Sequence, residues 1–154
     1  MTDHELLEFA AWIKRVDDSR TGDPLWSVQA YRLGVYAIEC HSHDRGKRPR
    51  RRKTATVDQL TRSIGSIAAN IAEGYSRGSL ADRVRFYEYA LGSVREAISW
   101  YDSLRVELGE VATARQAILI QIRRLLLTML RNIRTPSTLD RLQDAPPRSP
   151  IRDD

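Results

Sequence analysis

A dense run of cations is the sequence feature with the clearest chemical use. Residues 45 to 53 read RGKRPRRRK, in which seven of nine residues are basic. Cations at this density neutralise phosphates and release counterions, which predicts salt-sensitive binding to a nucleic-acid backbone. The run holds no aromatic side chain that could stack on bases, so backbone contact without sequence readout is expected; the alternative is a solvated loop that binds nothing specific. The predicted nucleic-acid-binding residues are Arg45, Lys47, Arg48, Arg50, Arg51, Arg52 and Lys53.

The charge of the whole chain isolates this basic run. The chain carries a net charge of +5, and with the seven cations of the run set aside, the other 145 residues carry −2. A second set of arginines lies between residues 111 and 134 with no acid among them. Either they extend the nucleic-acid surface or they form salt bridges with acids on a neighbouring subunit: Arg115, Arg123, Arg124, Arg131 and Arg134.

Three potential metal ligands, Cys40, His41 and His43, fall within four residues. They are too few for a closed zinc site, and the sequence has no second Cys/His cluster to complete one. Adjacent helix residues point to different faces, which argues against a Cys-His nucleophile pair. No Gly-rich phosphate loop, GxSxG or HExxH motif is present. We therefore expect no catalytic residue, no metal, no cofactor and no enzymatic activity.

Apolar residues recur at helical spacing along most of the chain, which predicts an all-α fold. We expect a single helical domain over residues 1–136, with a flexible Pro-rich tail over 137–154. Short connections between long helices favour an antiparallel up-down four-helix bundle with an extra short N-terminal helix and an irregular C-terminal tail. The bundle helices are expected at about 24–41, 56–74, 80–108 and 111–134, and the extra helix at 3–17, with its buried face formed by Leu6, Leu7, Ala10, Ile13 and Val16.

Capping residues set the expected helix ends. Asp23 before Pro24 and Ser79 before Asp82 are N-terminal signals. A capping box over residues 56–59 predicts a further helix start. Gly74 is placed at a left-handed C-cap, and a glycine at position 109 closes the following helix.

Residues 63–74, SIGSIAANIAEG, form a helix rich in small side chains. A glycine inside a helix costs about 1 kcal/mol relative to alanine, so Gly65 predicts a close helix contact, with Gly92 as the matching small residue. Asn70 and Glu73 share one helix face and are expected in a polar network. Arg62 or Arg85 could complete that network, and Arg85 could also pair with Glu88.

Two motifs resemble those of small four-helix-bundle proteins encoded in intervening sequences of bacterial 23S ribosomal RNA genes, a family related to the accessory proteins of diversity-generating retroelements. The first, SI-x-x-NIAEG, is matched by Ser66, Ile67, Asn70, Ile71, Ala72, Glu73 and Gly74. The second, RF followed by A-x-GS-x-x-E, is matched by Arg85, Phe86, Ala90, Gly92, Ser93 and Glu96. The resemblance covers about residues 24–134. Ala68 stands where the family usually has proline, and the basic run replaces the family's usual first connection.

The resemblance implies a ring-like homopentamer without a catalytic centre and with an association with nucleic acid. We expect a homo-oligomer that binds RNA or DNA backbone through the basic run. The alternative is a structural scaffold or accessory protein that docks a protein partner such as a reverse transcriptase. A single cysteine and the lack of a signal peptide or membrane-spanning stretch favour the cytoplasm, with no membrane partner.

Overall fold

The computed structural model describes residues 3–46 and 55–135, and every regular element in these ranges is helical. The ranges contain no strand, so the all-α prediction is confirmed. The tail over residues 137–154 lies outside them. In chain order the elements are α1 (Asp3–Ile13), α2 (Asp18–Thr21), the 3-10 helix η1 (Pro24–Ser27), α3 (Gln29–Gly46), α4 (Ala55–Tyr75), α5 (Leu80–Ser103), α6 (Arg105–Leu108) and α7 (Glu110–Arg134).

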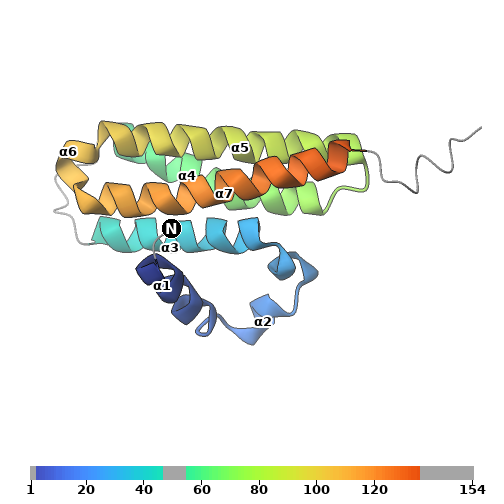
Figure 1. The fold of residues 1–154 in the computed structure, drawn as a ribbon, viewed down its shortest axis with the longest axis horizontal. Helices are drawn as coiled ribbons and strands as arrows, with labels where there is room; N and C mark the ends of the chain where they lie inside the picture. The colour runs from blue at the N-terminus through green and yellow to red at the C-terminus, as the bar shows by residue number, and fades with distance from the viewer. Residues whose placement is uncertain (1–2, 47–54, 136–154) are drawn as a thin grey trace, which may run out of the picture.

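Each of the four long helices, α3, α4, α5 and α7, packs against two of the others (Figure 1). α4 contacts α3 and α5, and α7 also contacts α3 and α5. Apolar residues at spacings of three and four point inward from each helix, and their burial is the main stabilising contribution. The largest fully buried side chains are Leu33, Leu60, Ile64, Ile67, Ile71, Val94, Ile118, Leu119, Ile122 and Leu126. Within the described ranges, no helix has the length and apolar character that a membrane span requires.

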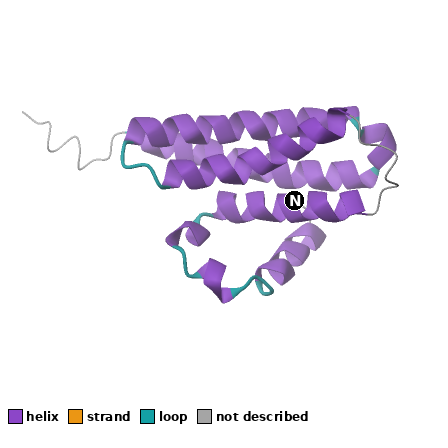
Figure 2. Ribbon diagram, turned by 180° about the vertical axis from the view of Figure 1, so that it is seen from behind, coloured by secondary structure: helices purple, strands orange, loops and turns teal. Residues whose placement is uncertain are grey.

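The N-terminal elements lie on the outer side of α3, away from α5 (Figures 1 and 2). The helix expected over residues 3–17 ends at Ile13. Its predicted buried face is wrong in part: Ile13 and Val16 pack against the core, but Leu7 is 71% exposed, and Phe9 and Trp12 are buried instead. The rings of Phe9 and Trp12 lie 5.3 and 5.2 Å from the ring of Tyr36 on α3. Aromatic side chains bury more area than leucine and alanine, so this contact decides how α1 is rotated.

The helix expected over residues 24–41 is divided into η1 and α3. The carboxylate of Asp23 caps η1 by accepting a hydrogen bond of 2.7 Å from the backbone N–H of Leu25. Val28 then takes an extended conformation and ends the element. This break turns Trp26 toward Trp12, at 6.0 Å between ring centroids. At the other end, α3 runs past His41 to Gly46.

The helix expected over residues 80–108 is also divided, into α5 and α6. Leu104 is buried at the junction and leaves the helical conformation, with φ −98° and ψ 4°. Gln116, buried on α7, donates hydrogen bonds to the backbone oxygen of Ile98 and to the carboxylate of Asp102, at 3.2 and 2.8 Å. Its own side-chain oxygen accepts a bond of 2.9 Å from Arg105. This polar network holds the end of α5 against α7.

Besides the start at Asp23 and Pro24, two predicted helix ends are confirmed and two are wrong. Ser79 caps α5 by accepting a hydrogen bond from the backbone N–H of Asp82. Gly109 ends α6 with a φ of +52°, which side chains other than glycine rarely adopt. Thr56 does not cap α4, because the helix already includes Ala55. Gly74 is not a left-handed cap, because it lies inside α4 and its φ is not positive.

Candidate functional site

The basic run connects the end of α3 to the start of α4. Of its seven cations, the structure describes Arg45, which is exposed on the last turn of α3. The other six lie outside the described residues: Lys47, Arg48, Arg50, Arg51, Arg52 and Lys53. The adjoining helix ends lie at the same end of the molecule as α6 (Figure 1). The described residues therefore show how the run is anchored.

A largely buried ion pair anchors the α3 side of the run. The Arg115 guanidinium on α7 donates two hydrogen bonds to the carboxylate of Asp44, at 2.8 and 3.1 Å. The two side chains are only 18% and 14% exposed. The hydrogen bond to Asp44 raises the pKa of Arg115, so the guanidinium stays charged. Because its residues are 71 positions apart, no local sequence pattern predicts this pair.

A hydrogen-bond chain joins the same turn of α3 to α4. A ring nitrogen of the buried His41 lies 2.9 Å from the Thr61 hydroxyl, which donates to the backbone oxygen of Val57 at 2.7 Å. Arg45 reaches the same hydroxyl at 3.4 Å. Together with the ion pair, these bonds fix both helix ends that border the basic run.

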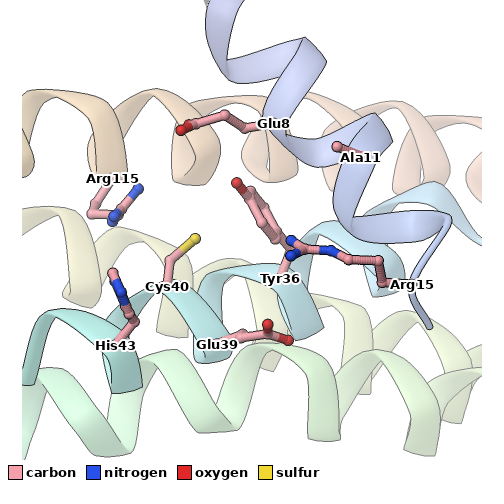
Figure 3. Close-up of a pocket in the computed structure, with 8 residues that line it drawn as sticks. All are labelled: Glu8, Ala11, Arg15, Tyr36, Glu39, Cys40, His43 and Arg115. Atoms are coloured by element: carbon pink, nitrogen blue, oxygen red, sulfur yellow. The ribbon is translucent and has the colours of Figure 1, made fainter. Parts of the chain in front are cut away.

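A groove of about 590 Å³ lies beside this anchor, between α1, α3 and α7. Figure 3 shows Tyr36 and Cys40 from α3, Arg115 from α7 and Glu8 from α1 around one space. Burial raises the pKa of both the Tyr36 hydroxyl and the Cys40 thiol, so both are protonated at neutral pH. A protonated thiol is a poor nucleophile, and Cys40 is therefore not poised for covalent chemistry.

The residues Cys40, His41 and His43 do not converge on one point. Cys40 and His43 border the groove, whereas the His41 ring is bonded to Thr61 on α4. In the described part of the chain, no group of three or more His, Cys, Asp or Glu side chains could hold a metal ion.

The polar residues of the two motifs form hydrogen bonds within their own helices. Asn70 donates to the backbone oxygen of Ser66 at 2.8 Å, and the Ser93 hydroxyl donates to that of Tyr89 at 3.0 Å. Glu96 accepts a bond of 3.1 Å from Trp100. These bonds are local and do not cross between helices.

The expected ion pairs of the motif residues are replaced by other ones. Glu73 pairs with Arg77, four residues further on, and not with Arg62 or Arg85. Arg85 pairs with Asp82 at 2.9 Å, and Glu88 pairs with Arg134 on α7. The Glu73–Arg77 and Arg85–Asp82 pairs join residues three or four positions apart, whose side chains lie on one face.

The close helix contacts involve glycines other than those expected. A Cβ atom added to Gly65 or Gly92 would meet no atom within 4 Å, so the predicted contact between them is wrong. A Cβ on Gly74 would lie 2.7 Å from the ring of Tyr87, and one on Gly34 would lie 3.3 Å from the Cβ of Ala68. Gly74 is therefore needed where α4 meets α5, and Gly34 lets α3 approach α4.

The five arginines of α7 divide into paired and open groups. Arg115 is bonded to Asp44, and Arg134 pairs with Glu88 on α5. Arg131 borders a groove of about 550 Å³ between α5 and α7, together with Arg95 and Leu127, which is 45% exposed. Arg124 is exposed and Arg123 is half-buried.

Known proteins resemble this chain in sequence and in fold. The sequence profile of the 23S rRNA-intervening sequence protein family matches residues 36–131, and the chain belongs to this family. The resemblance carried by the two motifs is thus confirmed. α1, α2 and η1 lie outside the matched range.

A crystal structure from Bacteroides thetaiotaomicron, of a protein with unknown function from the S23 ribosomal protein family, is similar to this chain with a TM-score of 0.56. The two are 21% identical over 66% of this chain and 94% of the other, a likeness that shows the fold alone. No curated protein matches the chain.

Proposed function

We propose that this protein is a non-enzymatic, homo-oligomeric helical bundle that binds the backbone of nucleic acid through its basic run. The four long helices would form an antiparallel up-down bundle, and the run would be the surface that contacts nucleic acid. The observation that carries the proposal is the placement of seven cations in nine residues between two anchored helix ends. Cations at this density can neutralise several phosphates and release their counterions.

Assembly into a ring would strengthen this binding. Family resemblance favours a homopentamer, in which several copies of the run act on one strand by effective concentration. Gly65 and Gly92 support a contact between copies, because a mid-helix glycine costs about 1 kcal/mol and no neighbour within the described chain requires either one. The unpaired Cys40 fits a reducing compartment such as the cytoplasm.

A second candidate function is docking of a protein partner, such as a reverse transcriptase. The groove between α5 and α7 favours it, because Leu127 is partly exposed between Arg95 and Arg131. An apolar centre with arginine at its edge is typical of protein interfaces.

Replacing Arg50, Arg51, Arg52 and Lys53 with serine tests the main proposal. Affinity for a labelled RNA or DNA strand, measured by fluorescence anisotropy at low salt, should be largely lost. A control in which Lys14, Arg15, Arg20 and Arg62 become serine removes the same charge from exposed positions outside the basic run. Equal loss in both variants would indicate a nonspecific charge effect, and unchanged binding in the first would overturn the proposal. If the parent protein bound no nucleic acid but bound a reverse transcriptase tightly, the second function would be favoured.

A further inference from the structure

The start of α5 lies at the end of the molecule opposite α6 (Figure 1). Arginine and aromatic side chains contact one another there. The guanidinium carbons of Arg77 and Arg85 lie 5.0 and 5.6 Å from the ring centroid of Phe86. The ring of Tyr89 meets Phe86 edge-on, at 5.8 Å between centroids and an interplanar angle of 88°. We name these four residues the arginine–aromatic cluster.

The cluster is held in place yet open to solvent. Glu73 pairs with Arg77, and Asp82 pairs with Arg85, so both guanidinium groups are oriented beside the ring. Tyr89 is 54% exposed, although its ring is fixed by Phe86. Fixed, exposed rings and guanidinium planes are the surfaces on which unpaired nucleic-acid bases stack.

The local charge also suits a nucleic-acid strand. Arg83 donates a hydrogen bond of 3.0 Å to the backbone oxygen of Arg77. The cluster region thus holds three arginines against the two acids Glu73 and Asp82. Arg134 reaches the same part of α5 through Glu88. This end of α5 is therefore net positive, as a phosphate backbone requires.

The geometry points to a base-stacking site for single-stranded nucleic acid on the arginine–aromatic cluster, with Tyr89 as its main platform. This inference rests on the proposed nucleic-acid binding and adds what the basic run lacks. The run offers cations without aromatic rings, and it can hold phosphates of either a single strand or a duplex. The cluster can distinguish a strand with accessible bases from one without them.

Binding to two single strands of equal length tests this site, one with bases and one abasic throughout. The full chain should bind the base-containing strand more tightly. Tyr89→Ala should weaken that binding about tenfold, in line with the usual contribution of one stacked base, and leave the abasic strand unaffected. Tyr89→Phe keeps the ring and should bind like the parent. Because Tyr89 is largely exposed, the fold should survive, as circular dichroism can verify.

The outcomes separate this site from the basic run. Equal binding to both strands, unchanged in Tyr89→Ala, would overturn the stacking site while the proposed function of the run still stands. No binding to either strand would overturn both. If Tyr89→Ala instead changed the molar mass by light scattering and kept the preference for bases, the cluster would be a contact between copies and the stacking site would be wrong.

Discussion

Two regions of the molecule differ in what their residues do. One is the contact between α4 and α5, and the other is the connection between α3 and α4. The first contains the two motifs that define the family, and its inward residues pack closely, as Gly74 does against Tyr87. The second contains the seven cations of the basic run. Residues that identify the family thus build the fold, whereas the residues with evident chemistry lie beside it. Stability and nucleic-acid binding should therefore respond to different substitutions.

The largest expected effect concerns the anchor of the basic run. Asp44→Ala leaves the largely buried Arg115 guanidinium without its carboxylate, which should lower the free energy of unfolding by about 3 kcal/mol. Urea denaturation measures the change. Replacing both partners, as Asp44→Leu with Arg115→Met, removes the unpaired charge and should recover most of the stability. A single variant as stable as the parent would show that the pair does not anchor α3 to α7.

The next largest effect tests the packing between α4 and α5. Gly74→Ala places a methyl group 2.7 Å from the buried Tyr87 ring, and overpacking of this kind should cost about 2 kcal/mol. Under conditions where the variant is folded, its affinity for nucleic acid should equal that of the parent. A variant that keeps its stability but loses affinity would reverse the roles assigned to the two regions.

Alkaline pH should lower the stability of the fold through the two groups Cys40 and Tyr36 in the groove beside the anchor. Burial raises the pKa of Cys40 and Tyr36 above their ordinary values of 9.0 and 10.0. Their contribution to stability is complete below pH 9.0 and is lost as the pH rises toward the folded-state values, because the unfolded chain releases these protons first. Urea midpoints should therefore fall above pH 9, and less steeply in Cys40→Ala. A parent midpoint that stays constant up to pH 11 would contradict the raised values.

The smallest expected effect comes from an outward position of the same motif region. Gly92→Ala meets no neighbour and should raise the free energy of unfolding by up to about 1 kcal/mol through helix propensity. The matched inward change, Gly74→Ala, has the opposite sign. Light scattering of Gly92→Ala tests the proposed contact between copies, which should weaken when a methyl group occupies that surface. If Gly92→Ala instead lowered the free energy of unfolding of the single chain, Gly92 would contact a neighbour within that chain.

The long helices could be predicted because their core positions repeat locally. Leu60, Ile64, Ile67 and Ile71 are spaced by three and four residues, and all are buried. The aromatic packing of α1 could not be predicted in this way, because Trp12 and Tyr36 meet only after α1 folds back on α3. The break at Val28 has the same origin, since it turns Trp26 into that cluster.

The candidate sites were predictable in part. A run of cations is visible in any sequence, but its anchor joins Asp44 to a residue on α7 that is distant in the chain. Sequence patterns also could not tell which glycines face a neighbour, because Gly65 and Gly74 lie on the same helix and only Gly74 meets one. The arginine–aromatic cluster was missed because it combines α5 residues with Arg77 in the preceding turn.

The salt dependence of nucleic-acid binding tests the central claim most directly. The logarithm of the binding constant should fall steeply and linearly with the logarithm of salt concentration for the parent. In the variant with Arg50, Arg51, Arg52 and Lys53 replaced by serine, the slope should be shallower by about three to four, at roughly one for each lost phosphate contact. An equal slope in both proteins, or a parent slope near zero, would contradict the account.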